Sequence, residues 1–233
     1  MNKTSSDAVE YHDKSVAKNW NDKYQLPTFQ LRVEIVKKML SDVAIDGQYW
    51  LDAGCGTGVM SRLLAENGSR VLGVDASHNM LEVAKLSSTG CDERVSYVHI
   101  DSIESLPFED GQFDGVVCSS VLEYVDDPKH CLTEFSRVLR PGGCLILSVP
   151  NSRSVIRQLH GVRYYIARGC GKSQSEFYGY SRNSYTRKSI RLAIVASGLL
   201  PEQTVQLGAI LPFFGICRSD LVSPLIFTLA KKK

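Results

Sequence analysis

The sequence lacks several features by which other classes of protein are recognised. It contains seven cysteines but no C-x-x-C pair, so neither a metal site nor a disulfide framework is expected. Long apolar runs are missing as well, because Arg218 and Asp220 interrupt the apolar stretches near the C-terminus, which are too short to cross a bilayer. The first residues, up to Lys14, contain no apolar signal-peptide core. These absences favour a cytoplasmic protein with reduced thiols.

The sequence also lacks an excess of charge of either sign. The formal net charge is +2, so the protein has no strong general field for nucleic acid. No internal repeat or low-complexity segment divides the chain. With 233 residues and 43% apolar residues, one substantial core and one domain spanning residues 1–233 are expected.

A glycine-rich stretch, Leu51-Asp52-Ala53-Gly54-Cys55-Gly56-Thr57-Gly58, stands between a buried strand and a helix. This arrangement predicts a turn that can hold a nucleotide-like ligand against its backbone. The glycines are spaced G-x-G-x-G, whereas dinucleotide enzymes use G-x-G-x-x-G. The acid at the mouth of the loop would repel a pyrophosphate but suits a ligand that carries an ammonium group.

Apolar strands alternate with amphipathic helices on both sides of this loop, which predicts a parallel sheet covered on both faces. The predicted strands are 48–53, 70–75, 95–101, 113–119, 144–149, about 204–210 and 225–230, and the predicted helices are 11–26, 27–41, 59–67, 77–86, 128–139 and 187–197. Residues 151–185 show no clear periodicity and are too long for an ordinary connection, so they are interpreted as a functional cap.

Acids end the second and third predicted strands. Asp75 can accept hydrogen bonds from both hydroxyls of a ribose, and Asp101 can accept one from an adenine amine, unless it only forms a turn. Met80 can pack on the face of an adenine or in the core.

These motifs resemble class I S-adenosylmethionine-dependent methyltransferases, in the small-molecule branch that includes ubiquinone- and menaquinone-pathway enzymes. The resemblance covers about residues 28–150 and includes Leu106-Pro107-Phe108, Val121-Leu122-Glu123-Tyr124-Val125-Asp126-Asp127-Pro128 and Leu139-Arg140-Pro141-Gly142-Gly143. It implies an α/β, Rossmann-like fold with a seven-stranded, mostly parallel sheet, helices on both faces and an antiparallel last strand. The implied donor is S-adenosyl-L-methionine, and the implied donor-binding residues are Asp52, Gly54, Cys55, Gly56, Gly58, Asp75, Ala76, Met80, Asp101, Ser102, Ile103, Cys118 and Ser119.

Methyl transfer requires alignment of the nucleophile, the methyl group and the sulfur, and a general base only when the nucleophile arrives protonated. The candidate bases are His160, Glu123 and Tyr124, with His12 and His130 also considered. Tyr124 stands where the resembling family commonly has histidine, which puts proton transfer from that position in doubt.

Two segments are candidates for contact with the methyl acceptor. Residues about 1–27 form either a helical lid or a short helix packed at the edge of the domain. Residues 151–191 carry nine basic side chains and one acid, which is either a solvated surface or a site for an anionic or phenolic acceptor. The candidate acceptor-binding residues are Tyr11, Trp20, Tyr24, Arg163, Tyr164, Tyr178, Tyr180 and Arg182.

The predicted function is therefore methyl transfer to a small molecule, with oxygen favoured as the methylated atom. Alternatives are carbon or nitrogen methylation of a quinone- or lipid-like acceptor, and donor binding without turnover. The basic cap and residues 210–214 could also contact an anionic membrane. Nucleic acid is not an expected partner, since no N-P-P-Y-type motif ends the fourth strand, and the oligomeric state stays open.

Overall fold

The computed structural model describes residues 4–15, 20, 24–43, 45–90, 93–169, 179–211, 215–217 and 219–233. Seven strands form one sheet in the order β3-β2-β1-β4-β5-β9-β6. The strands are β1 (Tyr49–Ala53), β2 (Arg70–Asp75), β3 (Val95–His99), β4 (Phe113–Ser119), β5 (Leu139–Pro150), β6 (Leu199–Gln206) and β9 (Leu225–Lys232), and β7 (Ala209–Leu211) with β8 (Gly215–Cys217) forms a separate pair.

The direction of the strands confirms the predicted fold. Strands β1 to β5 pair in parallel, whereas β9 runs antiparallel to both of its neighbours, β5 and β6. The last strand of the sheet is thus inserted between two strands that run the other way. Since parallel strands end at the same edge, the residues that follow β1 to β4 meet there.

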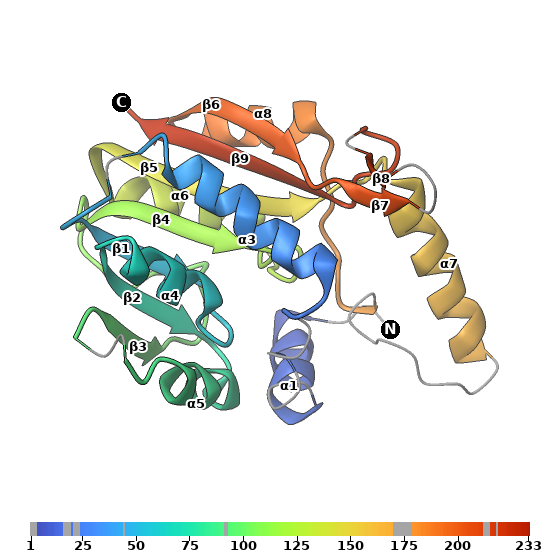
Figure 1. Cartoon of the computed structure of the whole chain (residues 1–233), viewed down its shortest axis with the longest axis horizontal. Coiled ribbons are helices and arrows are strands. Elements are labelled where there is room, and N and C mark those ends of the chain that lie inside the picture. The colour runs from blue at the N-terminus through green and yellow to red at the C-terminus, as the bar shows by residue number, and fades with distance from the viewer. Residues whose placement is uncertain are drawn as a thin grey trace.

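Helices cover both faces of the sheet (Figure 1). On one face α3 (Pro27–Leu40) and α4 (Val59–Glu66) pack over a core centred on Trp50, and on the other face α6 (Pro128–Val138) and α8 (Arg187–Ala196) pack over a core that includes Phe113 and Phe135. The helix α5 (His78–Ser87) packs against β2 and β3. Two helices, α1 (Ser5–Ser15) and α7 (Val155–Gly169), lie beyond the carboxyl ends of the parallel strands (Figure 1).

The structure corrects four of the predicted elements. The first helix starts at Ser5, and Asp7 caps this start because it accepts hydrogen bonds from the amide and the hydroxyl of Thr4. The fifth strand starts at Leu139, which pairs with Phe113. The sixth strand spans Leu199–Gln206, earlier than predicted.

The fourth correction concerns the predicted cap. Its first part is helical, because α7 spans Val155–Gly169. Val155, Leu159 and Val162 follow helical spacing, a signal that the sequence analysis missed, and all three side chains are exposed in the structure.

Two further findings concern the thiols and the membrane. Cys55, Cys118, Cys131 and Cys144 are buried free thiols. In the part of the chain that the structure describes, none of the helices combines the length and the apolarity that crossing a bilayer requires.

Candidate active site

A cavity of about 980 Å³ opens at the carboxyl ends of the parallel strands. Its wall is formed by the glycine-rich loop, the ends of β2, β3 and β4, and the helices α1, α3 and α7. The cavity is therefore built where the strand order switches between β1 and β4, the position at which open α/β sheets bind their ligands.

The three glycines of the loop all have positive φ, at 73° for Gly54, 52° for Gly56 and 76° for Gly58. A side chain on Gly56 would meet nothing within 4 Å, and this residue lines the cavity. A Cβ on Gly58 would instead lie 2.2 Å from the Tyr97 hydroxyl, and Gly58 is not part of the cavity wall. Gly56 thus leaves room for a ligand, and Gly58 lets the loop pack on β3.

Asp75 lies at the end of β2 and faces the cavity. Its two carboxylate oxygens accept hydrogen bonds from the Gly56 amide at 2.8 Å and from the Ser77 amide at 2.9 Å. Burial raises the pKa of Asp75, and these amides oppose the shift. The carboxylate retains lone pairs for the two hydroxyls of a ribose.

Asp52, which precedes the loop, is almost completely buried and also lines the cavity. The Ser61 hydroxyl donates to it at 2.6 Å. Burial raises the pKa of Asp52 to about 7. An ammonium group in the cavity would favour the ionised carboxylate and would supply the charge that its surroundings lack.

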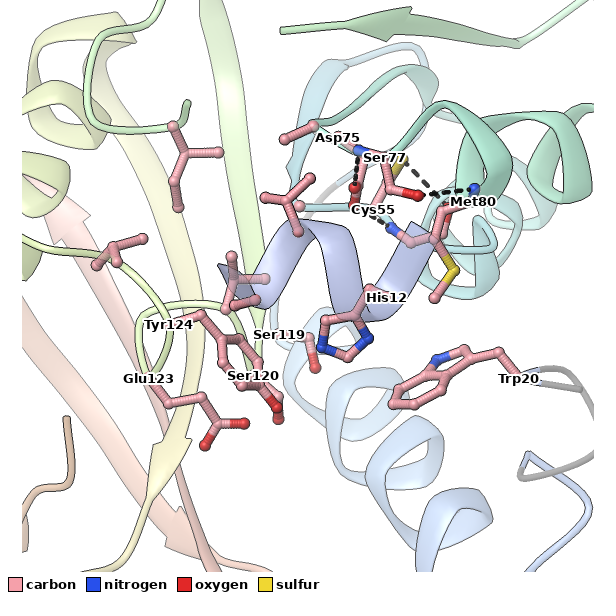
Figure 2. Close-up of a pocket in the computed structure, with 18 of the residues that line it drawn as sticks. His12, Trp20, Cys55, Asp75, Ser77, Met80, Ser119, Ser120, Glu123 and Tyr124 are labelled. Atoms are coloured by element: carbon pink, nitrogen blue, oxygen red, sulfur yellow. Dashed lines mark hydrogen bonds between the residues drawn. The ribbon is translucent and has the colours of Figure 1, made fainter. Parts of the chain in front are cut away.

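A second group of predicted donor residues also lines the cavity. Asp101, Ser102 and Ile103 line it after β3, and Ala76 and Met80 line it from the start of α5. Met80 is buried and packs against Tyr11 and Trp20. In Figure 2, Asp75, Ser77 and Met80 lie together on one side of this cavity. The acids and the apolar sulfur side chain are thus placed for an adenosine.

Two histidines that the sequence analysis did not select belong to this end of the cavity. The rings of His78 and His99 stack with their centroids 3.8 Å apart, and His99 Nε2 lies 3.1 Å from the Ala76 carbonyl. His78 is in the first turn of α5 and His99 ends β3. Because the two residues are far apart in the sequence, the sequence analysis could not predict that their rings stack.

Arg32 on α3 is a further cavity residue that the sequence did not reveal. Its guanidinium lies 4.2 Å from the centroid of the Phe29 ring. Its Nε is buried and has no hydrogen-bond partner among the residues that the structure describes. S-adenosylmethionine carries a carboxylate beside its ammonium group, and a carboxylate is the kind of ligand that such a guanidinium accommodates. The acids, the open glycine and this arginine therefore fit the donor.

At the end of β4, Ser119 lines the cavity, but Cys118 is fully buried behind it and does not. Ser120 has a φ of 60°, in the left-handed region that side chains rarely adopt. Its amide donates to the Ser148 carbonyl at 3.2 Å, which holds this conformation. The next residues, Val121 to Val125, turn along the cavity wall.

Two predicted bases lie in this turn. Glu123 is buried and pairs with Arg157 of α7 at 3.4 Å. Burial raises the pKa of Tyr124 well above its usual value, and the charge of Glu123 adds to this effect. Tyr124 therefore keeps its proton near neutral pH. Burial raises the pKa of Glu123 as well, and the charge of Arg157 opposes this shift.

The predicted acceptor residues of the cap lie mostly outside the cavity. His160 and Arg163 are exposed on α7, and Tyr164 on the same helix is buried; none of the three lines the cavity. Arg182 pairs with Asp126 and donates to the Val125 carbonyl at 3.3 Å. Tyr178 and residues 212–214 fall outside the described residues. The structure thus turns His160 and Arg163 of α7 away from the cavity and engages Arg182 with Asp126, so it does not bring these three residues together at the cavity.

The N-terminal segment contributes more of the predicted acceptor residues to the cavity wall than the predicted cap does. His12, Trp20 and Tyr24 line the cavity, and α1 is held from both sides. Tyr11 stacks on Tyr180 with the ring centroids 4.9 Å apart, and Ser5 donates to Asp126 at 2.8 Å. Neither Tyr11 nor Tyr180 lines the cavity, so these two residues anchor the helix.

Comparison with known proteins gives one family and several relatives. The family model described as "Methyltransferase domain" matches residues 51–147. A ubiquinone biosynthesis O-methyltransferase of Xanthomonas campestris pv. campestris is 32% identical over 196 residues, which cover 81% of this chain and 82% of that protein. A demethylmenaquinone methyltransferase of Clavibacter sepedonicus is 42% identical over 103 residues, which cover 44% of this chain and 41% of that protein.

Solved structures show the same fold at lower identity. Magnesium protoporphyrin IX methyltransferase from Synechocystis PCC 6803, with bound SAH, has a TM-score of 0.71 with 19% identity, covering 98% of this chain and 99% of that one. The 1,6-didemethyltoxoflavin-N1-methyltransferase of Burkholderia thailandensis has a TM-score of 0.68 with 18% identity, covering 98% of this chain and 87% of that one. Since a relative at 32% identity spans most of both chains, and the cavity fits the donor, this chain belongs to the S-adenosylmethionine-dependent methyltransferases.

Proposed function

We propose that this methyltransferase transfers its methyl group to an oxygen atom of a small phenolic acceptor. The observation that supports the proposal is that the donor residues and a group of aromatic side chains line one and the same cavity. The wall that holds the donor residues continues into an aromatic end formed by Trp20, Tyr24, Phe29 and Tyr124, with Leu225 beside them. Aromatic walls of this kind bind planar, mostly apolar molecules.

The charges at the aromatic end favour a phenol over a strongly anionic acceptor. Arg157 is paired with Glu123, and Arg32 is placed for the carboxylate of the donor. In the described part of the wall, the remaining groups of this end are aromatic or neutral, apart from His12 and the exposed Glu10. The relatives that act in ubiquinone biosynthesis as O-methyltransferases support oxygen as the methylated atom.

The chain positions the reactants and excludes water. S-adenosylmethionine, when bound, supplies an activated methyl group on a sulfonium that departs as a neutral thioether. Asp75 would hold the ribose, Asp52 the ammonium and Arg32 the carboxylate. We also propose that α1 is a lid, because its contacts at Ser5 and Tyr11 are with side chains near the surface and can be released to admit both ligands.

The test is an incubation with labelled S-adenosylmethionine and a panel of catechols, hydroquinones and aliphatic amines, followed by mass spectrometry of the products. Methyl ethers of the phenols are expected. Methylation of ring carbon would favour the alternative suggested by the demethylmenaquinone methyltransferase relative. Donor binding without any product would instead leave a protein that binds S-adenosylmethionine, and would refute the proposal.

A further inference from the structure

The proposed reaction needs a proton acceptor, because a phenol is protonated near neutral pH. The groups at the acceptor end of the cavity can be considered one by one. Glu123 is engaged with Arg157, and burial raises the pKa of both Tyr24 and Tyr124. The stacked pair of His78 and His99 lies at the adenosine end.

His12 of α1 is the remaining candidate for the proton acceptor, and it lies at the acceptor end of the cavity. Its ring centroid is 5.3 Å from that of Tyr124 and 5.4 Å from that of Trp20, with edge-to-face contact in both cases. Figure 2 shows the imidazole between Trp20 on one side and Ser119, Ser120 and Tyr124 on the other. The ring thus stands opposite the end of β4, between the donor loop and the aromatic wall.

We infer that His12 is the general base of this methyltransferase, so that the N-terminal helix brings the catalytic group into the site. The inference rests on the proposed methylation of a phenol. The phenol O–H bond breaks and its proton moves to a nitrogen of the neutral imidazole. The phenol oxygen forms a bond to the methyl carbon while the carbon–sulfur bond breaks, and that electron pair stays on sulfur. The imidazolium releases its proton to water when the products leave.

The environment of His12 is compatible with this role. The titratable and charged groups that line the same end of the cavity come from five segments: Glu10 on α1, Tyr24 before α3, Arg32 on α3, Glu123 and Tyr124 after β4, and Arg157 on α7. The buried carboxylate among them, that of Glu123, is paired with Arg157. The rings of Trp20 and Tyr124 flank the imidazole, which limits the access of water to the proton transfer.

The test compares two acceptors, catechol and 4-nitrocatechol, the second of which is largely ionised above neutral pH and needs no base. Replacing the base, in His12→Gln, is expected to lower kcat on catechol by about 100-fold and kcat on 4-nitrocatechol by less than about five-fold. The rise of the wild-type rate with pH that accompanies loss of the imidazolium proton should disappear with catechol in this variant. His12→Phe keeps the ring packing and should behave as His12→Gln does.

His160→Gln is the matched control, because His160 is an exposed histidine of α7 outside the cavity. Affinity for S-adenosylhomocysteine, measured by calorimetry, should be unchanged in all three variants. An equal loss on both catechols, or no loss on either, would overturn the role of His12 while leaving O-methylation intact. Absence of methyl ethers from both catechols with the wild-type protein would overturn the proposed function, and the inference with it.

Discussion

The donor half and the acceptor half of the cavity are built in different ways. Apart from Arg32 of α3, the donor half comes from consecutive elements between β1 and the loop after β3. It uses backbone groups and acids at strand ends, as the bonds of Asp75 to the amides of Gly56 and Ser77 show. The acceptor half comes from α1, α3, the turn after β4, α7 and the start of β9. Its wall consists mainly of side chains that are distant in sequence.

This difference explains where specificity can reside. A site made of backbone amides and short turns tolerates little change, because each glycine there has a steric reason. A site made of side chains from separate helices can change its ligand by substitution, without a change in the sheet. We therefore expect substitutions in the donor half to alter folding and donor affinity, and those in the acceptor half to alter turnover.

The largest expected effect concerns Asp52 and pH. Its pKa is raised by burial from 3.8 to about 7, so the folded protein holds a proton that the unfolded chain has already released. The stability that this proton contributes is fully present below the unfolded-state pKa and is lost as the pH rises through about 7. The free energy of unfolding is expected to fall by up to about 4 kcal/mol over this range. Denaturant unfolding of the ligand-free protein should show the decline, and Asp52→Asn should reduce it.

The same substitution should have the opposite signature in binding. Wild-type affinity for S-adenosylhomocysteine is expected to rise with pH as Asp52 ionises, since its ammonium group favours the carboxylate. Affinity that changes with pH identically in Asp52→Asn would show that the ammonium lies elsewhere.

The next effect separates two glycines of one loop. Gly58→Ala should lower the free energy of unfolding by about 3 kcal/mol, because φ is 76° and the new Cβ would lie 2.2 Å from the Tyr97 hydroxyl. Gly56→Ala is the control and should cost only about 1 kcal/mol of stability. Its methyl group would project into the cavity and weaken donor binding. Equal destabilisation by both would contradict the division of roles.

A smaller effect is expected from Asp75→Ala. Loss of the hydrogen bonds to the ribose should weaken binding of S-adenosylhomocysteine by about 30-fold, or about 2 kcal/mol, measured by calorimetry. Asp42→Ala, at an exposed acid after α3, should leave binding unchanged. If the affinity of Asp75→Ala equals that of the wild type, the ribose does not lie against this carboxylate.

The smallest effect tests the outward face of α7. Arg163→Gln is expected to change kcat and KM for a phenolic acceptor by less than about two-fold, because Arg163 is exposed and does not line the cavity. The measurement is steady-state kinetics on the same catechols. A large rise of KM restricted to acceptors with a negative charge would restore the cap as an anion site.

The sequence predicted the donor half well because its signals are local. A glycine pattern, an acid at each strand end and alternation of strand and helix occur within short stretches, and the cavity contains Asp52, Asp75 and Asp101 as expected. Gly58 and Cys118, which were also predicted donor residues, do not line the cavity. Spacing along a chain does not reveal which face of a turn a residue presents.

The acceptor half was harder to predict because its residues meet only after folding. The basic side chains after Pro150 suggested an anion site, but Arg157 is paired with a buried acid and Arg182 with an exposed one. In the donor half too, Arg32 and the stacked pair of His78 and His99 carried no local signal, because these residues come from separate elements that meet at the cavity. A count of charges in a segment does not show which of them are already neutralised by partners.

By itself, the sequence determined the fold, the donor loop and the chemistry of methyl transfer, since hydrophobic periodicity and turn glycines act over a few residues. Only the tertiary structure decided which side chains enclose the acceptor. It placed His12 opposite the end of β4, more than a hundred residues away in the chain, and it turned His160 toward the solvent. The physical reason is that burial and ion pairing depend on packing between elements, which no short stretch of sequence encodes.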